Sequence, residues 1–558
     1  MNSKSAKTAA DRHKKFLEFG FFAPELPPCF NSGDVAKYRN FISKAYHSLH
    51  TKNGTPAHFL KITRPTYFNF PRFGNADRRH GIVNPVSYFA LSEVLADNYV
   101  QLRQFAHKSK ISISPNLFDW QGRRAILRPR FELKDNFTSL VEANYEYIAH
   151  TDIAAFYHSI YTHSIPWALH GKDHAKKHKH DLSLIGNLID LLCRNSQDGQ
   201  TIGLTVGPDT SRMIAELIGT ALDLELASDD VSLVRSCKRF VDDFTIGCGS
   251  KPEADKIIAS IRRVAQKFEL ELNSRKTIVK ENVTRIENGW KDRIRAVVPK
   301  SPYAEADLNA YFFEISAVQA MLPEVNVLKF AVKNARVAFV NSPTWQTVYW
   351  FLLSSYRQNS TMVDSIVEIF IERQKTKKDL DVGSLRDFLA ARIPVLVEQR
   401  RDGELIWLLY LARCLKIKLR AKSLEEAFAR ANGIIALQIV EAAASKLIDG
   451  KIDYRLWDKS LSADALDDEM WLYAYESVRL GLRPFKNNYV LQHDLFSPFF
   501  AKNISFYKPE ENTPVFKNTM NSLKRENRLS QKLAQDFLED LQFDDEDDFD
   551  DFNAEDTY

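Results

Sequence analysis

The stretch KRFVDDFTIGCG, residues 238–249, places two adjacent aspartates, Asp242 and Asp243, between runs of β-forming residues. Two such runs that meet at an Asp pair predict a hairpin whose tight turn presents both carboxylates, because Asp tolerates turn backbone. A lone Asp pair is also a common solvated turn. Adjacent carboxylates repel each other unless they share a cation, so this hairpin is a candidate metal site.

A third aspartate supports the metal interpretation. Asp152 follows a β-like stretch at residues 145–148 and begins the segment DIAAFYHSIY. Three carboxylates from two strands can hold two divalent ions about 4 Å apart, as in phosphoryl transfer. Mg²⁺ is the expected occupant, since it prefers carboxylate and phosphate oxygens.

The segments around the aspartates follow a recognisable order. GLTVGPDTSR, residues 203–212, predicts a loop and then a helix between the two acidic sites, and a helix predicted after the hairpin ends in ELNSRK, residues 271–276. Over residues 30–300 this order resembles the palm of reverse transcriptases. The phrases FYHSIYTHSIPWALHGK and TVGPDTSRMIAE resemble the bacterial defence-associated, abortive-infection ("unknown group") reverse transcriptases.

The resemblance implies an α+β fold: the fingers and palm of a right-hand polymerase, then an all-α, helical-repeat-like C-terminal domain and an acidic disordered tail. The expected parts are an N-terminal extension (1–50), fingers and palm (51–300), a helical domain in place of a thumb (301–483), a C-terminal extension with an amphipathic helix (484–541) and the tail (542–558).

The same resemblance implies roles in catalysis. Asp152, Asp242 and Asp243 are the expected metal ligands, and Lys276 matches a lysine that is a candidate proton donor to the leaving pyrophosphate. Gly207 allows close backbone approach to template and nucleotide. Its loop departs from the commoner Pro-Gln-Gly pattern, which puts ordinary template handling in doubt.

Nucleotide binding is expected at two places. The match assigns the cation that contacts the triphosphate to Arg78 or Arg79, although an arginine pair is also an ordinary solvated feature. Tyr157 stands where the family has a bulky side chain beneath the sugar. A tyrosine there would clash with a 2′-hydroxyl, so deoxynucleotides are the expected substrates; the alternative is an ordinary core tyrosine.

A basic and aromatic segment, DWQGRRAILRPRF at residues 119–131, predicts a nucleic-acid groove, because guanidinium groups bind phosphate and aromatic rings stack on bases. Surface strand arginines are the alternative. The arginines expected to contact nucleic acid are Arg123, Arg124, Arg128, Arg130 and, at the end of the Gly-rich segment, Arg212.

Residues 170–180, HGKDHAKKHKH, would align His170, His174 and His178 on one face of a helix. Zinc binding is one interpretation, but no Cys or acidic set nearby completes a site. The intervening lysines favour a solvated basic segment that faces RNA.

Beyond residue 300 the apolar spacing is helical, and Trp345, Trp407 and Trp471 suggest a degenerate α-solenoid. The predicted helices are 305–321, 325–340, 344–357, 361–375, 384–400, 404–416, 423–431, 433–449 and 463–481. The predicted breaks are at Pro323, Pro343, Gly383, Gly403, Gly433 and Gly450.

The C-terminal end is acidic. Residues 536–558 contain twelve acidic side chains and no Lys or Arg, although the whole chain has a formal charge of +4. Such a tail is commonly solubilising, but its interleaved Phe549, Phe552 and Tyr558 also imitate a single-stranded nucleic acid. Some abortive-infection reverse transcriptases start DNA synthesis on a tyrosine hydroxyl of the protein itself. The resemblance therefore makes Tyr558 a candidate primer.

The cellular setting follows from composition. The five cysteines have no CxxC spacing, which argues against a disulfide framework or a cysteine zinc site. No apolar run approaches the ~20 residues needed to span a bilayer, so we expect a cytoplasmic protein with no membrane partner.

The favoured function is an antiphage DNA polymerase of reverse-transcriptase type that uses two Mg²⁺ ions and dNTPs. It is expected to be protein-primed, with a noncoding RNA template or none, to bind RNA and its DNA product, and to form a homo-oligomer. A conventional retroelement reverse transcriptase and a catalytically silent RNA-binding scaffold remain alternatives.

Overall fold

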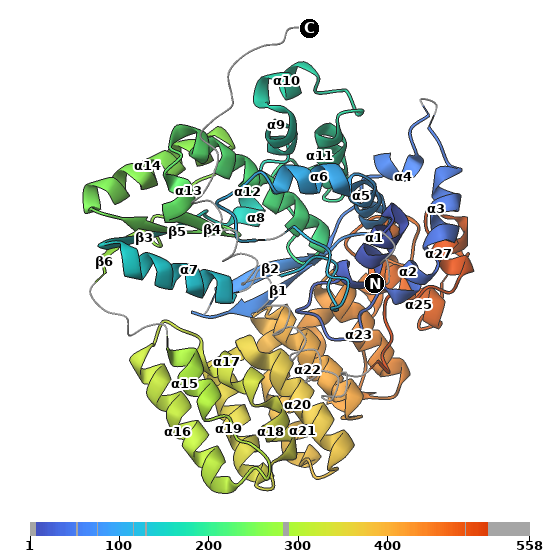
Figure 1. The fold of residues 1–558 in the computed structure, drawn as a ribbon. Helices are drawn as coiled ribbons and strands as arrows, with labels where there is room; N and C mark the ends of the chain where they lie inside the picture. Colours follow the sequence, from blue (N-terminus) through green and yellow to red (C-terminus); the bar gives the residue numbers. More distant parts are fainter. Residues whose placement is uncertain are drawn as a thin grey trace, which may run out of the picture.

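The computed structural model describes residues 7–51, 54–74, 76–114, 116–128, 131–282, 289–485 and 487–511. It is a mixed α and β structure in which most elements are helices (Figure 1). No helix within these ranges combines the length and apolar character that crossing a membrane requires. The predictions for Arg130, the helix at 519–541, the acidic tail and Tyr558 lie outside the described residues.

A four-stranded antiparallel sheet carries the three aspartates. Its strands are β3 (Tyr147–Asp152), β4 (Cys237–Phe240), β5 (Asp243–Cys248) and β6 (Ile278–Glu281), in the order β4-β5-β3-β6. The predicted hairpin at the Asp pair is confirmed as β4 and β5. The strand before Asp152 begins two residues later than the β-like stretch suggested, and it includes the aspartate itself.

Helices cover this sheet on both sides. Figure 1 places α7 (Phe131–Asn144) on one side, and α12 (Asp209–Asp229) and α14 (Lys251–Lys267) on the other. The predicted loop and helix after Gly203 are therefore confirmed. The prediction that the helix after the hairpin extends into residues 271–276 is wrong: α14 ends at Lys267, because Glu269 adopts a left-handed conformation (φ 62°) and reverses the chain.

The expected fingers contain a hairpin of β1 (Thr66–Arg72) and β2 (Ala76–Ile82). Two consecutive helices follow this hairpin, α5 (Pro85–Asp97) and α6 (Tyr99–Ala106). The break falls at Asn98, whose side-chain amide donates to the Val94 carbonyl at 2.9 Å and caps the first helix.

The histidine segment does not form one helix. After α8 (Phe156–Ser159), α9 (Ser164–His170) ends at Gly171, whose φ of 81° interrupts the helix before α10 (Lys172–Lys177); α11 (Ile185–Asn195) follows. His170 turns away to accept a hydrogen bond from the Gly186 amide at 3.1 Å. The predicted alignment of three histidines on one helical face is therefore wrong.

The region after residue 289 is dominated by helices, as predicted. They are α15 (Trp290–Ala296), α16 (Glu305–Met321), α17 (Val327–Asn334), α18 (Arg336–Asn341), α19 (Trp345–Gln358), η2 (Ser360–Met362), α20 (Val363–Thr376), α21 (Val382–Glu398), α22 (Asp402–Cys414), η3 (Ala421–Ala429), α23 (Gly433–Ala444), α24 (Arg455–Lys459), η4 (Asp464–Leu466) and α25 (Trp471–Leu480). Between them β7 (Leu419–Arg420) and β8 (Ile448–Asp449) form a short parallel pair.

Three glycines expected to separate helices lie in first turns instead: Gly383 in α21, Gly403 in α22 and Gly433 in α23. At Gly403 the reason is close packing on the fingers. A Cβ there would lie 2.7 Å from the carbonyl oxygen of Asn69 on β1. The helical region thus rests directly on the β1–β2 hairpin.

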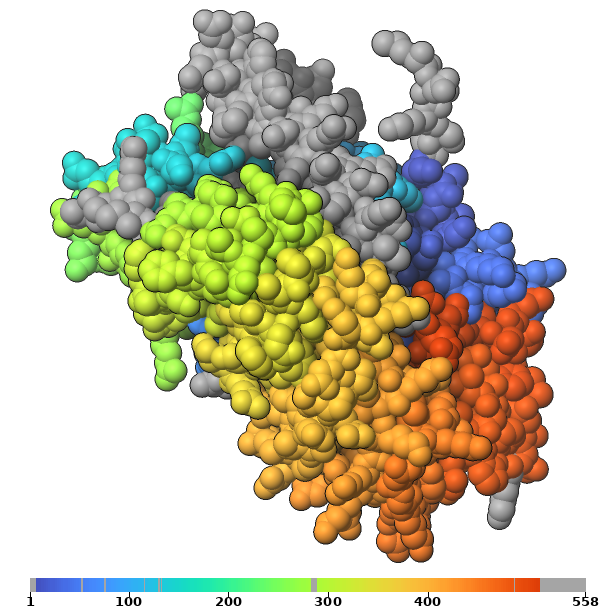
Figure 2. All heavy atoms as spheres, turned by 90° about the horizontal axis from the view of Figure 1, so that it is seen from below, coloured from blue at the N-terminus to red at the C-terminus, as the bar shows by residue number. Residues whose placement is uncertain are grey.

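The two ends of the described chain meet. The N-terminal elements are α1 (Ala9–Lys15), η1 (Phe16–Gly20), α2 (Gly33–Lys37), α3 (Arg39–His47) and α4 (Ala57–Leu60), and the last ones are α26 (Tyr489–Gln492) and α27 (Ser497–Ala501). Phe30 and Tyr507 form a β-bridge, and the Tyr46 hydroxyl donates to the Leu495 carbonyl at 2.7 Å. Figure 2 shows the C-terminal segment in red against the blue N-terminal segment.

Candidate active site

The three aspartates come together at one end of the sheet. Asp152 on β3 lies directly opposite Asp243 on β5 in the antiparallel register. Asp242 occupies the turn between β4 and β5, and its carbonyl accepts a hydrogen bond from the Ile153 amide at 3.2 Å. The backbone therefore joins all three positions, as the sequence predicted.

The turn that presents Asp242 is strained. Val241 has a φ of 63°, a left-handed conformation that β-branched residues rarely adopt. Two side chains hold it: Ser114 Oγ accepts from the Val241 amide at 2.8 Å, and Arg239 Nη1 donates to the Val241 carbonyl at 2.6 Å. Such strain persists where the surroundings impose it, and it is common at functional sites.

Arg239 itself is fully buried behind the hairpin. Its Nη2 donates to Glu216 at 2.8 Å and to Asp223 at 2.7 Å, and both carboxylates belong to α12. Gly219 leaves the space, since a Cβ there would lie 2.4 Å from the guanidinium. The sequence analysis missed this network. The sequence signal for it is the Lys238–Arg239 pair inside a predicted strand.

The electrostatics of the aspartates favour a bound cation. Burial, and then repulsion from Asp243 and Asp152, raise the pKa of Asp242 to about 6. Asp152 is only 4% exposed, and its Oδ1 has no hydrogen-bond partner among the described residues. A buried carboxylate oxygen without a partner is costly, and a bound cation would remove that cost.

Two lysines contact the same carboxylates. Lys276 forms an ion pair with Asp152 Oδ2, and Lys134 of α7 lies 3.2 Å from Asp243 Oδ2. The loop after α14 places Lys276, because the Asn273 amide donates to the Asp152 carbonyl at 2.8 Å. Lys276 therefore lies at the site, while its role as a proton donor stays a prediction. Lys134 was not predicted, because nothing in the sequence near it refers to the hairpin.

The residues present fit the expected Mg²⁺. The backbone brings three aspartates to one end of the sheet, one of them offers an unpartnered oxygen, and oxygen ligands are what Mg²⁺ prefers. The two lysines show that the cluster already attracts positive charge. Asp152, Asp242 and Asp243 would hold the ions.

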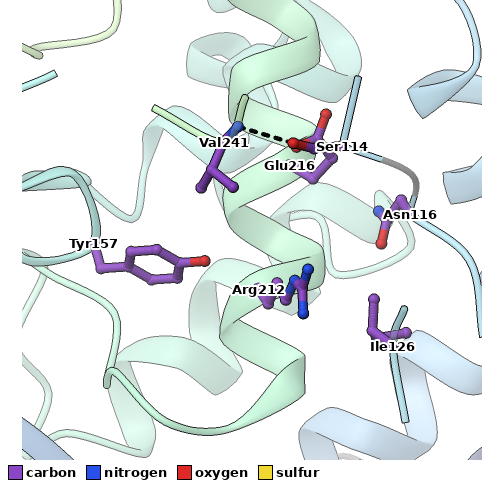
Figure 3. A pocket seen from close by; sticks show the side chains of 7 residues that line it. All are labelled: Ser114, Asn116, Ile126, Tyr157, Arg212, Glu216 and Val241. Carbon is purple, nitrogen blue, oxygen red and sulfur yellow. Dashed lines mark hydrogen bonds between the residues drawn. The ribbon is translucent and has the colours of Figure 1, made fainter. Parts of the chain in front are cut away.

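Tyr157 borders a small pocket beside the hairpin (Figure 3). Ser114, Asn116, Ile126, Tyr157, Arg212, Glu216 and Val241 line it. The Tyr157 hydroxyl points into the pocket, and the Tyr157 carbonyl accepts from the Leu204 amide at 2.6 Å, which fixes the residue against the Gly-rich loop. Burial raises the pKa of Tyr157 to about 12, so the hydroxyl stays protonated. Burial also lowers the pKa of Arg212.

The Gly-rich loop lies against the fingers hairpin. The Gly81 amide on β2 donates to the Val206 carbonyl at 2.9 Å. Gly207 has a φ of 132°, and a Cβ on it would lie 2.9 Å from Ala23, so both conformation and space require glycine.

The two fingers arginines are not equivalent. Arg78 and Arg79 are both exposed, but consecutive strand residues point to opposite faces. The guanidinium of Arg79 stacks 3.5 Å from the centre of the Tyr67 ring. Tyr67 on β1 is the register partner of Gly81 on β2. Arg79 is therefore the better placed of the two for a triphosphate near the loop.

The basic segment is only partly exposed. Arg123 and Arg128 are exposed, whereas Arg124 forms an ion pair with the fully buried Asp209 at the start of α12. Asp209 also accepts from the Ala125 amide at 2.8 Å. Arg124 thus fastens the fingers to the Gly-rich loop, and nucleic-acid contact by the other arginines stays a prediction.

Comparisons with known proteins identify no family. No protein-family model and no curated protein sequence matches the chain. Among solved structures, apo telomerase from Candida tropicalis is similar over 69% of each chain, with 14% sequence identity and a TM-score of 0.29. At that TM-score the similarity supports no conclusion about fold or function.

Proposed function

We propose that this protein is a nucleotidyltransferase of reverse-transcriptase type that adds deoxynucleotides to a growing DNA strand. The observation that carries the proposal is the register that places Asp152 opposite Asp243, with Asp242 in the adjoining turn and a buried Asp152 oxygen without a partner in the described structure.

The chemistry divides between the ions and the chain. When bound, two Mg²⁺ ions would lower the pKa of the attacking hydroxyl and neutralise charge on the leaving pyrophosphate. Asp152, Asp242 and Asp243 hold and space them. Lys276, beside Asp152, is positioned to deliver a proton to the leaving group, and Arg79 to bind the triphosphate.

Substrate choice is assigned to Tyr157. Its ring and hydroxyl border the pocket next to Val241, the residue that precedes the catalytic pair. A ribose 2′-hydroxyl at this position would meet the aromatic ring, so dNTPs are preferred over ribonucleotides. The exposed arginines Arg123 and Arg128 supply contacts to the nucleic-acid backbone.

The biological role rests on the sequence resemblance to abortive-infection enzymes. In this proposal the polymerase defends its host against phage, works on a noncoding RNA template or on none, and forms a homo-oligomer. DNA synthesis begins on a protein hydroxyl, for which Tyr558 is the sequence candidate.

The experiment is incubation of the purified protein with labelled dNTPs and Mg²⁺, without added template or primer. Products are separated on a denaturing protein gel with and without protease or RNase. Label that migrates with the protein and is released by protease supports protein priming, and RNase pretreatment tests for a copurified template. Tyr558→Phe should abolish the attachment; attachment that persists excludes Tyr558 as the primer.

Two other outcomes are distinct. Label that appears only after an annealed RNA template and primer are supplied identifies a conventional reverse transcriptase. The Asp242→Asn, Asp243→Asn double variant serves as the control for catalysis. If phage protection by this variant equals that of the wild type, the protein acts as a scaffold and the polymerase proposal is wrong.

A further inference from the structure

A second cluster of ligand-type side chains lies among the N-terminal helices. It consists of His47 at the end of α3, His58 on α4 and Glu93 on α5. One nitrogen from each histidine and a carboxylate oxygen of Glu93 lie within 4.8 Å of one another. In the part of the chain that the structure describes, no other group of three His, Cys, Asp or Glu residues meets this condition.

The separations fit one small ion. Glu93 Oε2 lies 3.0 Å from His47 Nε2 and 3.5 Å from His58 Nε2. Ligands about 2.0–2.1 Å from a tetrahedral Zn²⁺ are about 3.3 Å from one another. The other carboxylate oxygen of Glu93 accepts from Ser43 Oγ at 3.1 Å, which orients the carboxylate as an outer hydrogen bond does at metal sites.

His58 is the observation that points to a ligand. Its side chain is fully buried, yet neither ring nitrogen has a well-formed hydrogen bond within the described structure. Its Nε2 faces Glu93 Oε2 at 3.5 Å, which is longer than a good hydrogen bond. Neutral imidazole is the form of histidine that binds metals.

Glu93 is buried, and its carboxylate faces two imidazole nitrogens. No Lys or Arg of the described residues forms an ion pair with Glu93, whose only ion-pair partners there are the two histidines.

We propose that His47, His58 and Glu93 bind a transition-metal ion, Zn²⁺ by preference, which fastens α3 and α4 onto α5. Two imidazoles and one carboxylate are a donor set that Zn²⁺ accepts, with water in the fourth position, whereas Mg²⁺ prefers oxygen ligands alone. The site joins the N-terminal segment to a finger helix and uses none of the residues assigned to catalysis.

The test is metal analysis of the full-length protein. Dialysed protein is supplied with equimolar Zn²⁺ and then desalted, and retained metal is measured by mass spectrometry. Visible bands of tetrahedral Co²⁺ are recorded on a parallel sample. We expect about one ion per chain, a melting temperature that falls on chelation, and a loss of affinity of tenfold or more in His47→Gln and Glu93→Gln.

Matched variants make the outcome decisive. His47 is 44% exposed, so its substitution should leave the fold intact even if Glu93→Gln does not fold. The exposed His174→Gln is the control and should retain the ion, as should Asp152→Asn, which separates this site from polymerase activity. Wild-type protein that retains no zinc and shows no Co²⁺ bands, or His47→Gln that binds as tightly as the wild type, would overturn the proposal.

Discussion

Two groups of carboxylates flank the β4–β5 hairpin, and they are satisfied very differently. Behind it, Glu216 and Asp223 form short ion pairs with Arg239, which is completely buried. In front of it, Asp152 and Asp243 are opposite in the strand register and Asp242 adjoins them, and the lysine contacts of Asp152 and Asp243 leave one buried oxygen without a partner in the described structure.

The difference supports a structural role for the rear cluster and is consistent with the proposed catalytic role of the front cluster. Breaking a buried ion pair costs several kcal/mol, so the rear network stabilises the hairpin and its strained Val241. In the front cluster, burial of Asp242 and then repulsion from its neighbours oppose folding, in line with its raised pKa. Carboxylates that oppose stability are expected at sites where a ligand compensates for them.

The largest expected effect tests the front cluster. Asp152→Asn should reduce dNTP incorporation by about 10³-fold or more, because it removes a metal ligand from the reacting centre. Its melting temperature should stay close to that of the wild type, since the substitution removes both repulsion on Asp242 and the ion pair with the half-exposed Lys276. Incorporation rates and thermal unfolding are measured on one preparation. A large loss of stability would show that Asp152 has a structural role, like the residues of the Arg239 network.

The rear cluster should give the opposite result. Arg239→Met leaves two buried carboxylates uncompensated, so we expect the free energy of unfolding to fall by about 3–5 kcal/mol in urea titrations. Arg263→Met is the control, because the Arg263–Asp229 pair is exposed and should contribute less than about 1 kcal/mol. Equal effects of the two substitutions would contradict the structural role of Arg239.

Acid should separate the clusters further. The pKa of Asp242 is raised from 3.8 to about 6, so between about pH 4 and 6 the folded state binds its proton more tightly than the unfolded state. Wild-type stability should therefore fall as pH rises through this window relative to Asp242→Asn.

Below pH 6 the apparent Mg²⁺ affinity should weaken about tenfold per pH unit, because a proton on Asp242 competes with the ion. Calorimetric unfolding measures the dependence of stability on pH, and Mg²⁺ titrations measure the dependence of affinity on pH. Identical pH profiles of the wild type and Asp242→Asn would contradict the raised pKa of Asp242.

Substitutions of Tyr157 test whether the pocket beside the front cluster selects deoxynucleotides. Tyr157→Ala should raise ribonucleotide use relative to dNTPs by about tenfold or more, since it removes the ring from the pocket. Tyr157→Phe keeps the ring and should retain selectivity. The measurement is competition between labelled UTP and dTTP, and unchanged discrimination in the alanine variant would show that the tyrosine is a core residue.

The smallest effect is expected at Lys134. Its ammonium group is partly exposed beside Asp243, so Lys134→Met should change stability by less than about 1 kcal/mol. A few-fold decrease in the Mg²⁺ concentration at half-maximal rate is expected, because a competing cation is removed. A loss comparable to that of Asp152→Asn would instead make Lys134 a catalytic residue.

Local patterns were enough to predict much of this fold. The hairpin at Asp242 follows from β-forming runs on both sides of a turn pair, and α16 has the predicted bounds because its apolar spacing is regular. The approach of Asp152 to Asp243 came from the resemblance and is confirmed by the strand register.

The features that the sequence did not predict depend on contacts between distant segments. Arg239 is paired through α12, Lys134 reaches the site from α7, and the ligands His47, His58 and Glu93 come from three helices. None of these has a local spacing signal. The break at Gly171 was also missed, since the histidine spacing suggested a continuous helix, although glycine with positive φ ends helices readily.

The most direct measurement is Mg²⁺-dependent incorporation of labelled dNTPs by three proteins: the wild type, the double variant Asp242→Asn, Asp243→Asn, and the control Arg263→Met. Circular dichroism checks that each is folded. The assignment predicts incorporation by the wild type and the arginine control, and none above background by the folded double aspartate variant. Equal incorporation by all three, with the aspartate variant folded, would contradict the assignment of catalysis to these carboxylates.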